Sequence, residues 1–167
     1  MFGGEANTFA AEEKLLSALS SKLIHCGPVG SGQMMKAVNN VIYDINIAAI
    51  CEIIPLAIAS GLDTDAVVQT VLSGSSNSFA AGHFLPRVME RQFEGDFPMQ
   101  SAYKDIQNIQ ALMVASDETN PAFDPESMTT TKGMVALYER ALQEGYGESA
   151  KSAMFRIFEK QHGVKVN

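Results

Sequence analysis

The sequence predicts a mainly α protein: an all-α helical bundle with one long central helix, preceded by a short helix and a strand. Apolar residues recur at helical spacing in nearly every segment beyond Gly30. The segment 31–60 is long enough to form the central rod, and short breaks rich in Gly, Ser, Asp and Pro separate the segments that follow. With 167 residues, 46% of them hydrophobic, the chain can bury one sizeable core.

The first thirty residues differ from the rest. The segment 7–20 has a candidate N-cap in Asn7 or Thr8 and leucines at helical spacing, which predicts a helix. The apolar run KLIHCG after it predicts a strand, and no later segment offers that strand a partner. A helix followed by a lone strand is typical of the end of an α/β unit. We therefore expect two parts, residues 1–29 and residues 30–167.

The second part is expected to be a succession of helices. Gly61 ends the long helix at about residue 60. The breaks are the segments 73–78, 93–98, 116–125 and 144–147. The further helices are predicted at about 64–72, 80–91, 100–115, 126–143 and 149–160.

Composition excludes several classes of function. A formal net charge of -7 argues against a nucleic-acid partner, because binding phosphate backbones requires clustered cations. Cys26 and Cys51 are too few for a disulfide framework or a zinc site and fit a reducing compartment. The three histidines lack ligand spacing, so we expect no metal. No secretion signal opens the sequence, which favours the cytoplasm, with the mitochondrial matrix as an open alternative.

The apolar run 41–59 approaches the length that spans a membrane. Asp44, Asn46 and Glu52 lie inside it, and Pro55 would disturb its last turns. A buried helix of a globular domain is the better interpretation, so we expect no membrane partner.

The stretch GPVGSGQMMKAVNN, residues 27–40, places three glycines before a lysine and two asparagines. Such a glycine cluster marks a tight turn or a close approach to another group. Lys36 and Asn40 are four residues apart and share a helix face. This polar stripe could simply face solvent. Because apolar residues occupy most of the remaining circumference, we expect the helix to be buried nearly all round and the stripe to line a cleft.

A lysine in a cleft suits proton transfer. Its ammonium group can give a proton to a carbonyl that is being reduced, and its amine can take one from an alcohol that is being oxidised. An asparagine offers both a donor and an acceptor to orient the same oxygen. The glycine spacing does not match the dinucleotide fingerprint G-x-G-x-x-G, because Met35 stands where the last glycine would be.

Together these residues closely resemble the signature G-x-x-G-x-G-x-x-x-K-x-x-x-N of the β-hydroxyacid dehydrogenases, the family that includes 3-hydroxyisobutyrate dehydrogenase and tartronate semialdehyde reductase. The segment AAICEIIPLAIASGLD is similar to a further family segment, and SAYKDIQNIQALMVAS is similar to the family's Lys-Asp helix. The closing EGYGESAKSAMFRIFE also resembles the family pattern. The resemblance covers almost the whole chain.

The resemblance implies a role for each matching residue. Lys36 would be the catalytic acid/base, Asn40 would orient the substrate, and the turn at Gly30 and Gly32 would form the wall beside it. Lys104 would contact an NAD or NADP cofactor near its nicotinamide end, although by itself it is an ordinary solvated helix charge. The resemblance also implies a small hydroxy acid or semialdehyde as substrate, a homodimer or homotetramer, and a fold like the C-terminal domain of 6-phosphogluconate dehydrogenase.

The sequence departs from the family at its start. Family members begin with a complete Rossmann domain carrying G-x-G-x-x-G, whereas here only the last helix and strand of that domain are expected. Pro55 also stands where related helices continue, so a kink or a changed interface is expected there. Two hypotheses follow: the catalytic and dimerisation part of a dehydrogenase, inactive alone, or a non-catalytic helical module for self-association. The identity of the hydroxy acid and the choice between NAD and NADP are left open.

Overall fold

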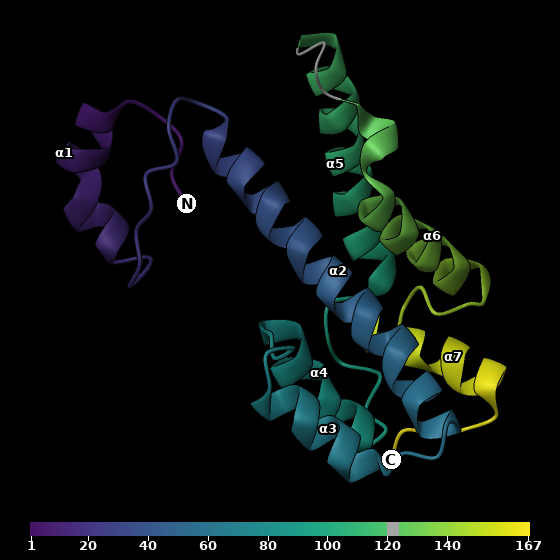
Figure 1. Ribbon diagram of the computed structural model, residues 1–167. Coiled ribbons are helices and arrows are strands. Elements are labelled where there is room, and N and C mark those ends of the chain that lie inside the picture. The colour runs from purple at the N-terminus through teal and green to yellow at the C-terminus, as the bar shows by residue number, and fades with distance from the viewer. Residues whose placement is uncertain (120–123) are drawn as a thin grey trace. The chain divides into compact units, whose positions relative to one another are not determined.

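The computed structural model describes residues 1–119 and 124–167, without the side chains of residues 110, 112–119 and 125. The described chain is mainly helical and divides into two compact units, Met1–Ile42 and Tyr43–Asn167. The long helix α2 (Ser31–Ala59) contributes its first turns to one unit and its remainder to the other. The prediction of a mainly α fold around one long helix is confirmed (Figure 1).

The first unit contains α1 (Ala6–Ser17), the segment that follows it and the start of α2. The predicted strand at KLIHCG is not formed, because this segment makes only an isolated parallel bridge between Phe2 and His25. Its short backbone partner lies earlier in the chain, so the expectation that no later segment supplies one is not contradicted. The amide of Phe2 donates to the Ile24 carbonyl and the amide of Cys26 donates to the Phe2 carbonyl, both at 2.8 Å. The partner precedes the segment in the sequence and is too short to form a regular strand pair.

The second unit is a helical bundle. After α2 come α3 (Thr64–Ser73), α4 (Phe79–Met89) and α5 (Met99–Thr119), then η1 (Pro125–Ser127), α6 (Thr129–Gln143), η2 (Lys151–Met154) and α7 (Phe155–His162). In this unit α3 packs against α4, and α5 lies beside α6 (Figure 1). The helix predicted at 149–160 is instead a 3-10 turn followed by a short α-helix. The predicted break at 116–125 begins later, because α5 continues to Thr119, and its residues 120–123 lie outside the described chain.

Local capping sets the helix ends. The side chain of Asp63 accepts a hydrogen bond from the Ala66 amide at 2.9 Å, and Ser78 accepts from the Ala81 amide at 3.1 Å. Gly61 follows α2 with φ 93°, a left-handed conformation that glycine adopts at no steric cost. Helix α2 continues through Pro55 to Ala59, so the proline does not end it.

The core lies in the second unit. One face of α2 supplies Ile47, Cys51 and Ile54, and burial raises the pKa of the Cys51 thiol well above its ordinary value. The largest fully buried side chains from the other helices are Phe84, Leu85, Phe93, Met99, Ile106, Tyr138, Met154, Phe155 and Ile157. Among the described helices, α2 is long and apolar enough to cross a membrane by length and composition, with 28% of its most apolar window buried; a core helix passes the same test.

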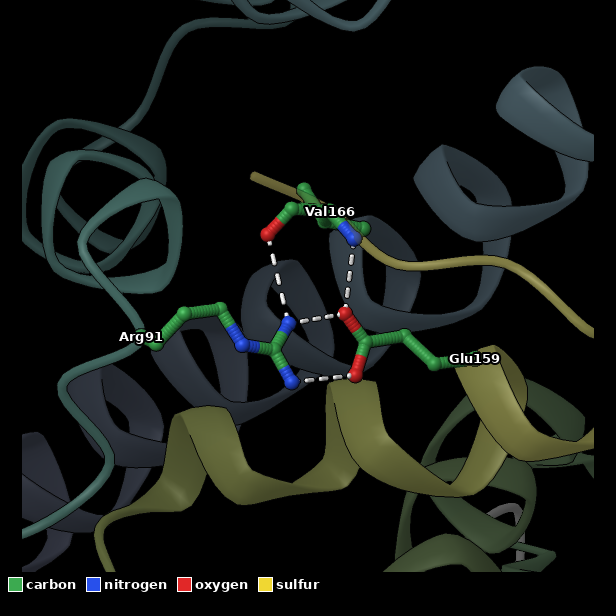
Figure 2. A network of polar contacts seen from close by, with 3 residues as sticks. All are labelled: Arg91, Glu159 and Val166. Carbon is green, nitrogen blue, oxygen red and sulfur yellow. Dashed lines mark hydrogen bonds and ion pairs between the residues drawn. The ribbon is translucent and has the colours of Figure 1, made fainter.

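An ion pair secures the end of the chain in this unit. Arg91 has a left-handed backbone, φ 60°, and its guanidinium binds both carboxylate oxygens of Glu159 on α7 (Figure 2). The same carboxylate accepts a hydrogen bond from the Val166 amide at 2.7 Å, and Arg91 donates to the Val166 carbonyl at 3.3 Å. Val166 is fully buried as a result.

A short pairing positions the start of α5. Pro98 and Ala150 form an isolated antiparallel bridge, and the amides of Met99 and Gln100 donate to the carbonyls of Ser149 and Gly147. The glycine-rich segment before η2 is therefore a structural partner of the segment that leads into α5, the helix that carries Lys104.

Candidate functional site

The glycine cluster forms a turn that starts α2. Gly27 and Gly30 have φ values of 117° and 96°, which lie in the region that only glycine adopts freely. The Ser31 amide donates to the Pro28 carbonyl at 3.0 Å, and the Gln33 and Met34 amides donate to the Gly30 carbonyl at 3.1 Å. The backbone freedom of these glycines is thus used to turn directly into the helix.

The third glycine of the cluster, Gly32, permits a close approach. A Cβ on Gly3 would lie 2.7 Å from the Gly32 amide nitrogen and 2.9 Å from the Pro28 carbonyl oxygen, and a Cβ on Gly32 would lie 3.1 Å from the Gly3 nitrogen. Two backbones therefore meet here without side chains between them. The Gly4 amide donates to the Gly27 carbonyl at 2.8 Å, which holds the first residues beside the turn.

This contact creates a hollow of about 360 Å³ at the start of α2. Gly30, Gly32 and Lys36 line it, so three of the residues predicted from the sequence lie at one place. Its size is at the lower end of the range for small-molecule sites. The remaining lining residues, which the sequence reasoning missed, are Met1, Gly3 and Gln33. Gln33 lies inside the quoted glycine–lysine stretch, whereas the sequence signal for Met1 and Gly3 is the Phe-Gly-Gly of residues 2–4, whose pairing with residues 24–27 local patterns do not reveal.

Charge and dipoles make this hollow suitable for an anion. Lys36 brings an ammonium group with three donors, and the start of α2 carries the positive end of the helix dipole. Asn40, predicted to orient the substrate, is half-buried, lies one helical turn beyond Lys36 and is not among the residues that line the hollow. A small anionic group such as a carboxylate fits this charge.

One expectation about this helix is wrong. Within the first unit α2 is not buried nearly all round, because Met34, Met35, Val38 and Ile42 are all exposed. The unit of residues 1–42 is too small to cover an apolar helix, and none of the residues of α1 is buried. The buried residues of α2 begin at Asp44.

Lys104 lies in the other unit, on the second turn of α5, with its side chain exposed. The neighbouring Tyr103 donates a hydrogen bond to Glu139 on α6 at 2.7 Å. That bond, with some burial, raises the pKa of the Tyr103 phenol. Helix α5 is thereby tied to α6 next to Lys104, whose contact with a cofactor stays a prediction.

A buried polar network holds the inner part of α2. Asp44, 1% exposed, accepts a hydrogen bond from the Tyr138 hydroxyl at 2.8 Å and forms an ion pair with Lys151. The Lys151 ammonium lies 4.5 Å from the centre of the Tyr43 ring. Burial, followed by the charges of Asp96 and Asp44, raises the pKa of Tyr43 to about 12, and burial beside Asp44 raises the pKa of Tyr138 well above its ordinary value. The network joins α2 to α6 and η2.

A family-level sequence comparison matches most of the chain. The model described as "NAD-binding of NADP-dependent 3-hydroxyisobutyrate dehydrogenase" matches residues 30–158. Among curated relatives, an uncharacterised oxidoreductase of Synechocystis sp. is 32% identical over 65% of this chain and 38% of its own length. The 2-(hydroxymethyl)glutarate dehydrogenase of Eubacterium barkeri is 26% identical over 100% of this chain and 53% of its own length.

Solved structures share the fold. A 3-hydroxyisobutyrate dehydrogenase from Salmonella typhimurium superposes with a TM-score of 0.77 at 19% identity, covering 93% of this chain and 52% of that one. The Mycobacterium tuberculosis enzyme, solved with L-serine, gives 0.73 at 22% identity over 93% and 53%. The chain spans about half the length of the relatives that it matches.

Proposed function

Because the chain belongs to the family of NADP-dependent 3-hydroxyisobutyrate dehydrogenase, we propose that it supplies the acid/base part of an NAD(P)-dependent β-hydroxyacid dehydrogenase. The observation that carries this proposal is the hollow in which Lys36 meets Gly30 and Gly32 at the start of α2. The substrate class is a small hydroxy acid or its semialdehyde. Three relatives carry the names of dehydrogenases of 2-(hydroxymethyl)glutarate, L-serine and 3-hydroxyisobutyrate, all small hydroxy acids.

The proposed role of Lys36 is proton transfer at Nζ. When the alcohol is oxidised, the amine takes the hydroxyl proton, and in the reverse direction the ammonium returns it to the carbonyl oxygen. Asn40 orients the same oxygen through its carboxamide. The nicotinamide cofactor supplies the hydride acceptor or donor when bound. Lys104, an exposed cation on α5, suits a contact with the anionic dinucleotide.

The chain by itself is proposed to be inactive. Hydride transfer needs cofactor and substrate held together in reactive geometry, and the chain has no G-x-G-x-x-G dinucleotide fingerprint in its sequence. A test is to fuse the N-terminal half of the Salmonella relative to this chain and to measure NAD(P)-dependent oxidation of L-serine and 3-hydroxyisobutyrate. We expect turnover in the fusion and none in the chain alone.

Substitutions in the fusion separate the roles. Lys36→Met should lower kcat about 10²- to 10⁴-fold, the usual contribution of a positioned acid/base. Asn40→Ala should raise KM and lower kcat less. Lys14→Met, on the exposed surface of α1, is the matched control and should change neither constant. Turnover that survives Lys36→Met unchanged would refute the acid/base role.

A second candidate function is self-association. It is favoured by the row of exposed apolar side chains on α2, namely Met34, Met35, Val38, Ile42, Ile53 and Leu56. Water-exposed apolar surface of this extent is typical of a protein interface. Sedimentation equilibrium of the chain should give a homodimer or homotetramer, and Val38→Glu with Ile42→Glu should shift it toward monomer. A monomer at high concentration would contradict this candidate.

A further inference from the structure

The first residues of the chain form one wall of the Lys36 hollow, the cavity at the start of α2 that Gly30, Gly32 and Lys36 line. Gly3 is the wall residue closest to the helix, since a Cβ on Gly3 would lie 2.7 Å from the Gly32 amide nitrogen. Residues 1–4 lie outside both α1 and α2. The position of this wall therefore depends on the contacts that residues 1–4 make with their neighbours.

The side chain of His25 makes one of these contacts. Its Nε2 lies 2.7 Å from the carbonyl oxygen of Gly4. A carbonyl oxygen only accepts hydrogen bonds, so Nε2 carries the hydrogen and donates it. Gly4 is buried, and a buried carbonyl without a partner destabilises the fold. His25 therefore holds the residue that directly follows Gly3.

Aromatic neighbours fix the orientation of the His25 ring. The Phe9 ring of α1 stacks on it, with centroids 5.2 Å apart and an interplanar angle of 24°. The Phe2 ring lies 6.1 Å from His25 and 5.3 Å from Phe9. Because the three rings pack together, the imidazole loses little further conformational freedom when it donates to the Gly4 carbonyl.

Backbone hydrogen bonds alone hold the wall over a short length. They attach residues 2 and 4 to the segment 24–27, each at 2.8 Å, and Gly3 lies between these attachments. A short two-stranded pairing of this kind is marginal in water without support from side chains. The His25 bond supplies such support next to Gly3, so its loss should let the wall move away from Gly32.

Resting on the proposed function, we propose that His25 is a positioning residue for the Lys36 hollow. Its hydrogen bond to the Gly4 carbonyl keeps Gly3 against Gly32 and thereby sets the space between this wall and the Lys36 ammonium group. His25 is not among the residues that line the hollow, so it acts through the wall and not on the substrate. Its loss should weaken the binding of a small carboxylate more than it slows proton transfer.

The first test uses the chain alone and requires no turnover. NMR spectra follow the Gly32 amide and the Lys36 ammonium group while 3-hydroxyisobutyrate is added. We expect His25→Ala to move both resonances before the ligand is added and to weaken its binding about two- to tenfold, the range for one lost hydrogen bond. His25→Gln should restore the parent behaviour, because its carboxamide nitrogen can donate to the same carbonyl.

The second test uses the fusion with the N-terminal half of the Salmonella relative. His25→Ala should raise KM for 3-hydroxyisobutyrate about two- to tenfold and leave kcat nearly unchanged, with His25→Gln close to the parent. Phe9→Leu removes the flat face beside the imidazole but keeps an apolar side chain, so it should give a smaller change in the same direction.

His162→Ala is the matched control, because His162 ends α7 in the other unit. It should leave the resonances and both kinetic constants unchanged, and circular dichroism should show that every variant keeps its helices.

The inference is overturned if the Gly32 and Lys36 resonances stay in place in His25→Ala, or if His25→Gln loses as much as His25→Ala. Resonance changes spread evenly over residues 1–42 would indicate a merely structural role and would also overturn it, as would a fall in kcat with KM unchanged. The resonances of the chain alone decide the question even if the fusion shows no turnover. Lys36→Met tests the acid/base role separately, so the two proposals fail independently.

Discussion

Arg91 and Glu159, 68 residues apart in the sequence, form a two-point ion pair (Figure 2). Two guanidinium nitrogens of Arg91 each bind one carboxylate oxygen of Glu159, and the distance from Nη2 to Oε2 is 2.9 Å. The Glu159 side chain is 6% exposed and that of Arg91 is 34% exposed. Because Glu159 also holds the Val166 amide, this one carboxylate joins the end of α4, α7 and the last residues of the chain.

Replacing Glu159 should loosen that junction. Glu159→Gln keeps an acceptor for the Val166 amide but loses the ion pair, so we expect the free energy of unfolding in urea to fall by about 2 kcal/mol. The matched control is Glu126→Gln, which breaks the exposed ion pair with Lys132 and should cost less than about 1 kcal/mol. Equal losses in the two variants would show that the buried carboxylate has no special role.

Asp44 and Lys151 allow a double-mutant cycle. Lys151→Met leaves a buried carboxylate without its cation and should cost about 3 to 5 kcal/mol. The pair Asp44→Asn with Lys151→Met removes both charges yet keeps an acceptor for the Tyr138 hydroxyl, so it should be more stable than Lys151→Met alone. Chemical unfolding of the four proteins measures this coupling, and additive losses would contradict it.

The lowered pKa of the Asp96 carboxyl predicts that the stability of the fold depends on pH. Burial acts to raise the pKa of its carboxyl, but hydrogen bonds from His83 and the Phe97 amide, with the charges of His83 and Arg87, hold that pKa below its ordinary value. The carboxylate therefore stabilises the fold at pH above about 4 and loses this effect as the pH falls through its lowered pKa. The difference in melting temperature between the parent and Asp96→Asn should be largest near neutral pH and shrink below pH of about 4. A difference that does not vary with pH would exclude this linkage.

Replacing Gly3 is expected to disturb the backbone of the first unit locally. Gly3→Ala places a methyl group within 3 Å of backbone atoms of Gly32 and Pro28, which cannot move as a flexible side chain would. We expect faster hydrogen exchange at the Gly4 and Cys26 amides, with the amides of α4 and α7 unchanged.

Gly133→Ala on α6 is the control for that variant, because a Cβ at Gly133 meets nothing within 4 Å. It should stabilise the second unit by about 0.5 to 1 kcal/mol. If the Cys26 amide exchanges its hydrogen as slowly in Gly3→Ala as in the parent, the backbones at Gly3 and Gly32 can move apart without loosening the pairing of Phe2 with Cys26.

The helical part of the fold was predictable because its signals are local. Helix ends at Asp63, Ser78 and Gly61 follow from capping and from left-handed glycine, which act within four residues. The same holds for the turn at Gly30 and the spacing of Lys36 behind it. The sequence therefore predicted part of the lining of the Lys36 hollow, namely Gly30, Gly32 and Lys36. The burial of α2 was overestimated, because an apolar surface does not specify what covers it.

By itself the sequence determined the helices, the glycine turn and the lysine that follows it. Only the tertiary structure decided that Phe2 pairs with residues near His25, that Gly3 meets Gly32, that Asp44 binds Lys151, and that Phe79 stacks on His83. The physical reason is the distance along the chain over which each interaction acts. Helix periodicity and capping depend on neighbours a few residues away, whereas these contacts join backbones and side chains that packing alone brings together.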